Sequence, residues 1–174
     1  MESAIKEPLS ARINFRIILF SAVLIALIGI PVYIYVDSVI HHGVKNQGSY
    51  YEVDLKSMGN FSFNDLTGTA NDIPAQWRQL DGKRVLLQGE VFAPNEAGDR
   101  MTQFQLVYSI AKCCFGGPPK VQERVFAVVP KDMQVPNLTY QFARVTGTLH
   151  INLTREEGKV NQMYVLDVDK VDPM

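Results

Sequence analysis

Hydrophobic residues are distributed unevenly along the chain, and the longest run of them lies near the N-terminus. From Ile17 to Val36 no position carries a charge, and about 20 apolar residues are enough for a helix to cross a bilayer core. A cleaved signal peptide would have a shorter apolar stretch and a small-residue cleavage site, which the following residues lack. A buried helix of a globular domain would carry a polar face, and this run has none. The pattern predicts a transmembrane helix at 17–36, preceded by a tail at 1–16.

After this helix the hydrophobic pattern changes from a continuous run to an alternation. Residues 37–48 have the polar composition of a linker, and residues 49–174 are expected to form one domain. From Lys83 onward apolar and polar residues alternate with period two, which is typical of strands that bury one face. The pattern predicts five strands, at Lys83–Phe92, Gln103–Ser109, Glu123–Pro130, Phe142–Leu153 and Asn161–Val171.

The segment that precedes these strands has a mixed pattern. Residues Tyr50–Asn64 alternate in part and predict one or two short strands. Asp72 is a candidate N-cap and Pro74 suits the first turn of a short helix that carries Trp77. The pattern leaves open whether the residues before Asp72 belong to the same sheet as the later strands.

Two glycines indicate how the five strands are arranged. Gly89 and Gly147 fall in the middle of the first and fourth strands, where a small closed barrel needs its strands to bend sharply. An open sandwich with the same number of strands is the alternative, but it would leave exposed edges to protect. The predicted fold class is therefore mainly β, a five-stranded barrel of the oligonucleotide/oligosaccharide-binding (OB) type, tethered to one N-terminal transmembrane helix.

Charged residues next to the apolar run predict its orientation. Arg12 and Arg16 lie close before it and Asp37 directly after it. Because basic flanks stay on the cytoplasmic side, the N-terminus is expected in the cytoplasm. The sequence thus predicts a membrane-anchored protein whose C-terminal domain is exported; the resemblance given below implies the bacterial inner membrane and the periplasm.

The charge of the predicted domain bears on its partners. Without residues 1–36 the chain keeps 14 basic and 16 acidic residues, a formal charge of -2. No cluster of Lys and Arg stands out, so nucleic acid is not an expected partner. A membrane-protein partner fits the predicted location better.

The loop between the second and third predicted strands has an unusual residue composition for a β domain. It contains both cysteines of the chain as direct neighbours, and a Gly-Gly-Pro-Pro stretch that bends and then stiffens the backbone. A rigid loop between strands is a common place for a binding site. The candidate ligand or partner residues are Cys113, Cys114, Phe115, Gly116, Gly117, Pro118 and Pro119.

The two cysteines are compatible with several chemical roles. In an oxidising compartment they could form a strained vicinal disulfide or a redox-active thiol pair. Thiolates also favour soft metals such as zinc or copper, but a structural zinc site needs four ligands. The missing ligands would then come from His150, from the pair His41–His42 or from another chain. The remaining alternative is that the cysteines only pack in the core.

Signals for catalysis are weak. The sequence contains no G-x-S-x-G elbow and no phosphate-binding glycine loop. Asp167 and Asp169 share one face of the last predicted strand, which indicates a solvated surface. We therefore expect no catalytic residue and, more generally, no enzyme.

The segment Leu80-Asp81-Gly82-Lys83-Arg84-Val85 is followed by Gly89, Pro94, Phe104-Gln105-Leu106-Val107, Cys113 and Pro118-Pro119. This order and spacing, over about residues 73–130, resembles a family of exported bacterial domains of unknown function. The resemblance implies an anchored periplasmic protein with an accessory or binding role, in some cases beside export or metal-uptake systems. The family pattern has one cysteine followed by a histidine, whereas Phe115 and two glycines follow the cysteines here. A metal site that uses that histidine would be incomplete in this chain.

The sequence therefore predicts a membrane-anchored periplasmic accessory or binding protein, a subunit or partner of an inner-membrane system of the transport type. The alternative hypothesis is a thiol-dependent metal-binding or redox protein that acts through Cys113 and Cys114. A purely structural module is the third.

Overall fold

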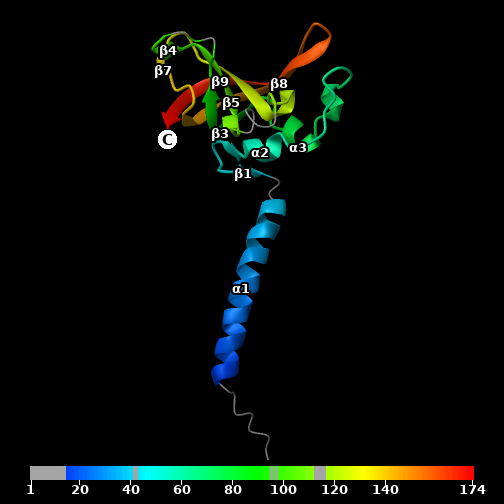
Figure 1. Cartoon of the computed structure of the whole chain (residues 1–174), viewed down its shortest axis with the longest axis vertical. Helices are drawn as coiled ribbons and strands as arrows, with labels where there is room; N and C mark the ends of the chain where they lie inside the picture. The colour runs from blue at the N-terminus through cyan, green and yellow to red at the C-terminus, as the bar shows by residue number, and fades with distance from the viewer. Residues whose placement is uncertain (1–14, 41–42, 95, 97, 112–116) are drawn as a thin grey trace, which may run out of the picture. The chain divides into compact units, whose positions relative to one another are not determined.

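The computed structural model describes residues 15–40, 43–94, 96, 98–111 and 117–174. The chain divides into two compact units, Met1–His41 and His42–Met174. Figure 1 shows a helix in the first unit and a sheet-rich domain in the second. The two units are described separately below.

The first unit contains one long helix. Helix α1 spans Phe15–Ile40, 26 residues with Pro31 inside, so the helix expected at 17–36 is confirmed and is longer at both ends. Every residue from Ile18 to Tyr33 is exposed. In the part of the chain that the structure describes, no helix meets the length and apolarity required for crossing a membrane.

The second unit is built mainly from strands. Each of the five predicted strands is present, with boundaries that differ by a few residues at some ends. They are β3 (Lys83–Phe92), β5 (Gln103–Val107), β6 (Arg124–Val128), β8 (Phe142–Glu156) and β9 (Lys159–Pro173). The β8–β9 hairpin is the longest pair, and its orange tip extends away from the other strands in Figure 1. The predicted mainly β class is confirmed.

The strand pairings form a closed circuit. Strand β3 pairs with β5, β5 with β6, and β8 with both β9 and β3, all antiparallel. The link between β6 and β9 is parallel. Each of the five strands therefore has two neighbours within the set, which satisfies backbone groups that an edge strand would expose.

Two short strands at the start of the second unit extend this sheet. Strand β1 (Val44–Asn46) pairs with β2 (Tyr51–Val53), which runs parallel to the first half of β3. Part of the expected linker therefore belongs to the sheet. Residues Val53 and Leu55 also join the same hydrophobic core as the later strands.

Gly89 and Gly147 lie where the backbone of a neighbouring strand comes very close. A side chain on Gly89 would meet the carbonyl oxygen of Val107 at 2.5 Å. A side chain on Gly147 would collide with the carbonyl oxygen of Asp167, next to a register shift in the β8–β9 ladder. Both glycines therefore permit a close approach of neighbouring strands.

The segment before β3 differs from its prediction. In place of a second strand it forms helix α2 (Leu55–Met58), because Asp54 caps the helix by accepting hydrogen bonds from the backbone N–H groups of Lys56 and Ser57 at 3.2 and 3.1 Å. The predicted N-cap role of Asp72 is wrong. Asp72 ends the short helix η1 (Ala70–Asp72) and accepts from the backbone N–H of Thr69 at 2.7 Å, whereas Pro74 precedes helix α3 (Ala75–Arg78).

The hydrogen bonds of Asp72 also affect its acidity. Bonds from the backbone and side chain of Thr69 hold the pKa of the Asp72 carboxyl below its ordinary value. The carboxylate is fully exposed, so its main effect is local: it fixes the turn that leads into α3.

A small ribbon was not expected from the sequence. Strand β4 (Arg100–Met101) pairs with β7 (Val135–Pro136), outside the five predicted strands. Helix η2 (Val121–Glu123) leads into β6. The ribbon places Met101 and Val135 in the core, where they are 2% and 3% exposed, so it closes one side of the domain.

Candidate functional site

A groove lies on the outer side of the β3–β5–β6 sheet. It has a volume of about 150 Å³. Aromatic rings, glutamine amides and loop residues share its lining. The lining residues are Phe92, Ala93, Pro94, Glu96, Gln103, Phe104, Gln105, Phe126, Ala127, Val128 and Gln162.

The register of three strands places the two aromatic rings on either side of one glutamine. Phe92 of β3 lies opposite Gln105 of β5, and Gln105 lies opposite Phe126 of β6. Residues directly opposite on neighbouring strands share a face of the sheet. A row of phenylalanine, glutamine and phenylalanine therefore crosses the floor of the groove.

The alternation in β5 and β6 explains why these side chains face outward. Phe104 and Leu106 are buried, at 3% and 0% exposure, so the glutamines between and beside them point away from the core. In β6, Val125 and Ala127 are buried, at 0% and 1% exposure, so Phe126 between them points away from the core. Core packing on one face thus positions the polar and aromatic groups on the other.

The glutamine amides of the groove have free hydrogen-bonding capacity. No hydrogen bond joins the side chains of Gln103, Gln105 or Gln162 to another residue in the described part of the chain. Each amide offers two donors and an acceptor. The groove therefore presents several unused polar groups beside two aromatic rings.

Glu96 anchors the loop that forms one wall. Its Oε1 accepts hydrogen bonds from the Thr102 hydroxyl at 2.8 Å and from the backbone N–H groups of Thr102 and Gln103 at 3.4 and 3.2 Å. Asn137 also donates to the Glu96 carbonyl oxygen, at 3.4 Å. Much of the carboxylate's accepting capacity is used inside the protein.

Arg124 supports one of the two rings. Its guanidinium carbon lies 5.4 Å from the centre of the Phe126 ring, which is a cation–π distance. The same side chain donates to the Asn161 carbonyl oxygen at 2.9 Å and to its side-chain oxygen at 3.1 Å. Burial lowers the pKa of Arg124 from its ordinary value. The guanidinium therefore lies against Phe126 and is held by Asn161, while its Nε is buried without a hydrogen-bond partner among the described residues.

An exposed tyrosine lies beside the other ring. Tyr140 has φ +67°, in the left-handed region where an aromatic residue is unusual, and is 68% exposed. Its backbone N–H donates to the Val91 carbonyl oxygen at 2.8 Å. Its ring lies 6.3 Å from the Phe92 ring at 60°, an edge-to-face contact. Tyr140 thereby extends the aromatic surface beyond the groove.

The loop predicted to carry the site falls largely on residues that the structure does not describe. Cys113, Cys114, Phe115 and Gly116 lie outside the described residues, as do His41 and His42. Gly117 has φ +90° and is exposed together with Pro118, and Pro119 is half-buried. The hypotheses of metal, redox and disulfide chemistry at the cysteines therefore stay predictions.

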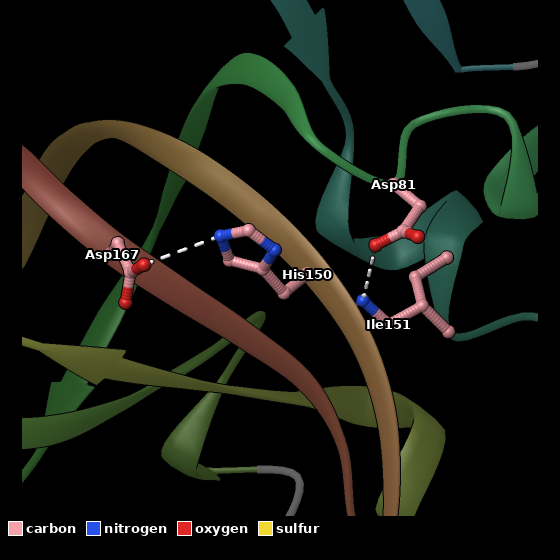
Figure 2. Close-up of polar contacts among 4 residues, drawn as sticks. All are labelled: Asp81, His150, Ile151 and Asp167. Carbon is pink, nitrogen blue, oxygen red and sulfur yellow. Dashed lines mark hydrogen bonds and ion pairs between the residues drawn. The ribbon is translucent and has the colours of Figure 1, made fainter.

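His150 occupies an ordinary position on the outer face of β8. Its Nε2 lies 3.2 Å from Oδ2 of Asp167 on β9, as Figure 2 shows, and the two side chains are 44% and 63% exposed. The neighbouring Ile151 donates its backbone N–H to Asp81 at 2.9 Å. Within the described ranges no group of three or more metal-binding side chains gathers, at His150 or elsewhere. An exposed ion pair of this kind contributes little to stability.

The sequence did not single out the groove. Its residues are ordinary members of alternating strands, and Gln103 and Gln105 differ from other outward positions only by being uncharged amides. The useful signal was the Gln-Phe-Gln order of β5, but only the strand register shows that Phe92 and Phe126 flank it.

The fold and the groove together define a small, mainly β domain with a groove on its sheet. The chain belongs to the family described as "Protein of unknown function (DUF3299)", whose model matches residues 53–173. The expected membership in a family of domains of unknown function is thus confirmed, over a longer segment than the predicted 73–130. The match includes all of β3, β5, β6, β8 and β9.

One solved structure supports the fold. The chain is similar to a DUF3299 family protein from Pseudomonas aeruginosa PAO1, with 19% identity and a TM-score of 0.50. The likeness covers 73% of this chain and 97% of that one, and at this identity it concerns the fold alone. No curated protein matches the chain significantly.

Proposed function

We propose that the protein is a membrane-anchored periplasmic binding protein whose partner is an inner-membrane system of the transport type. The groove is its binding site. The observation that carries this proposal is the groove itself. It joins two aromatic rings with amides that have no partner in the described part of the chain. Concave sites with apolar walls and a few convergent polar groups are the usual form of ligand sites.

The circuit of pairings supports a barrel of the OB type as the scaffold. The order β3–β5–β6–β9–β8 returns to β3, and the one parallel link joins β6 and β9, the third and fifth of these strands in chain order. In such barrels the face of the second and third strands is a common ligand surface. The groove lies on the corresponding strands, β5 and β6.

The apolar run supports the anchor. Of the 20 residues from Ile17 to Val36, 13 are Ile, Leu, Val or Phe. At roughly 0.3–0.6 kcal/mol each, they favour insertion by about 4–8 kcal/mol. The residues from Ile18 to Tyr33 are exposed. Arg12 and Arg16 before the run support a cytoplasmic N-terminus.

The proposal can be tested by photo-crosslinking in living cells. A photoreactive amino acid replaces Gln105 in the groove and, as a matched control, Arg144, an exposed outward position of β8. We expect a defined adduct with a membrane component from position 105 and none from position 144. The absence of an adduct at 105, or equal adducts at both positions, would contradict a membrane partner at the groove.

A further inference from the structure

We propose that the groove binds a neutral carbohydrate, with one sugar ring on the row formed by Phe92, Gln105 and Phe126. The inference deepens the proposed function, on which it rests, because it names the ligand class of the same site. Four properties of the groove carry it: its size, its charge, its hydrogen-bonding groups and the pairing of its strands.

The size of the groove fits one six-membered ring. Its volume is about 150 Å³, and an apolar protein cavity of about this volume takes up benzene. A pyranose ring has a similar core. Because the site is a surface groove, ring substituents and neighbouring sugar units can extend out of it.

The charge of the groove disfavours ionic ligands. Among the described lining residues only Glu96 is charged, and its Oε1 already accepts from Thr102 and Gln103. Phosphates and nucleic acids are bound through Lys and Arg, which are not among the lining residues. The nearby Arg124 is not a lining residue, donates through Nη2 to Asn161, and has a buried Nε.

The polar groups match hydroxyls. The side-chain amides of Gln103, Gln105 and Gln162 can each donate and accept, and sugar hydroxyls do the same. The rings of Phe92 and Phe126 supply flat apolar surfaces on both sides of Gln105 for the C–H faces of a sugar ring. An apolar ligand would leave the amides without partners when it covers them, which costs free energy.

The pairing of the strands disfavours an extended peptide. A peptide that binds as an added strand needs a strand with a free edge. The strands that form the groove, β3, β5 and β6, each pair with a neighbour on both sides. Binding must therefore use side chains of the sheet face.

Tyr140 provides a second stacking surface for an adjoining sugar unit. A glycine would fit its positive φ without strain, yet the position holds a large ring that is 68% exposed and contacts Phe92 edge-to-face. Core packing does not account for so exposed a ring. Its contact with Phe92, a residue of the groove lining, explains it better, because the ring then lengthens the aromatic surface for a second unit.

The test is a titration of the full-length protein, labelled with ¹⁵N-glutamine, in a detergent without a sugar head group. The probes are maltotriose, cellotriose and tri-N-acetylchitotriose, with trigalacturonate as the anionic contrast. We expect at least one neutral trisaccharide to shift the side-chain amide signals of Gln103 and Gln105. A Gln105→Leu variant should bind it at least tenfold more weakly, and trigalacturonate should also be at least tenfold weaker. No shift with any neutral sugar up to about 10 mM, well into the range of weak binding, or equal affinity for trigalacturonate, would overturn the proposal.

A pair of glycine substitutions separates binding from folding. Tyr140→Gly and Glu157→Gly both relieve a positive φ, +67° and +50° respectively, but Glu157 lies in the β8–β9 turn outside the groove. Both variants should keep or raise the melting temperature, and only Tyr140→Gly should lose affinity, by about fivefold. Equal affinities of the two variants would exclude stacking on Tyr140.

The two experiments distinguish the proposals. A photo-crosslink at position 105 together with no sugar binding would overturn the carbohydrate and retain the binding role. Sugar binding that depends on Gln105 without a membrane adduct would retain the carbohydrate site and overturn the membrane partner.

Discussion

Tyr164 carries a polar group into the centre of the domain. The residue is 0% exposed, and its hydroxyl has no hydrogen-bond partner among the described residues. An unsatisfied buried hydroxyl costs about 1–3 kcal/mol. Burial also raises the pKa of the Tyr164 phenol above its ordinary value of 10.0, because the phenolate is poorly solvated there. The hydroxyl therefore offsets part of the stabilisation that burial of the Tyr164 ring provides.

Replacing Tyr164 by phenylalanine should stabilise the protein. The ring stays and the unpaired hydroxyl leaves, so we expect the free energy of unfolding at pH 7 to rise by about 1 kcal/mol. Since the folded-state pKa is raised, the wild type should lose stability as the pH rises above 10, and the variant should lose less. Denaturant unfolding at pH 7 and at a pH above 10 measures both effects. Tyr108→Phe, at a ring that is 44% exposed, is the control and should change neither; a destabilised Tyr164→Phe protein would show that the hydroxyl has a partner.

The cysteine pair stays a prediction at the residue scale. If Cys113 and Cys114 bind zinc or copper, the purified full-length protein should contain metal near one equivalent per chain, and a Cys113→Ser/Cys114→Ser variant should contain none. The reason is that thiolates provide the soft ligands for these ions. Elemental analysis after dialysis measures the content. His150→Ala is the matched variant: loss of metal in it would add the histidine to the ligands, and the absence of metal in all three proteins would contradict the hypothesis.

At the scale of single elements, β8 depends on a glycine at its irregular point. A Cβ on Gly147 would collide with the Asp167 carbonyl oxygen and would come within 3.1 Å of the Leu166 side chain. The ladder of β8 and β9 shifts register at the same place. The register shift at Gly147 therefore affects how the longest hairpin of the domain pairs.

Gly147→Ala should destabilise the domain by about 1–3 kcal/mol, the usual cost of forcing extra atoms into a packed interior. Backbone atoms, which cannot rotate away, form the closest contact. Gly98→Ala is the control, because nothing lies within 4 Å of its Cβ position, and it should change stability by less than about 0.5 kcal/mol. Denaturant midpoints of the two variants decide: equal values would show that the strands do not approach each other so closely.

Local sequence patterns predicted the long elements but failed for helices of only three or four residues. The five strands of the circuit follow from alternation alone, because core packing imposes it on every strand with one buried face. Helix α2 was missed since its four residues are too few for helical periodicity, and only the cap by Asp54 indicates it. Asp72 was assigned the wrong role because two short helices share the segment in which one was expected.

At the scale of the whole molecule, the anchor is the feature to test. Replacing Leu24, Ile25 and Ile28 together by arginine should release the protein from membranes. Each arginine costs about 2.5–3.5 kcal/mol at the centre of a membrane helix, and the three together exceed the roughly 4–8 kcal/mol that favours insertion. Flotation of cell membranes in a density gradient measures the association.

A triple replacement of the same residues by phenylalanine is the control and should float with the membranes like the wild type. Wild-type protein that remains at the bottom of the gradient, or a floating arginine variant, would contradict the anchor.

The sequence by itself determined the long N-terminal helix, the mainly β class and the five strands, and it singled out the two glycines at which strands approach closely. These features depend on length, periodicity and residue size, which are local properties of the chain. The tertiary structure alone decided which strands are neighbours and therefore which side chains meet. Phe92, Gln105 and Phe126 are separated by 13 and 21 positions in the sequence, and they form one row only because the register of β3, β5 and β6 brings them together. Register is set by packing of the whole core, and a local pattern cannot contain it.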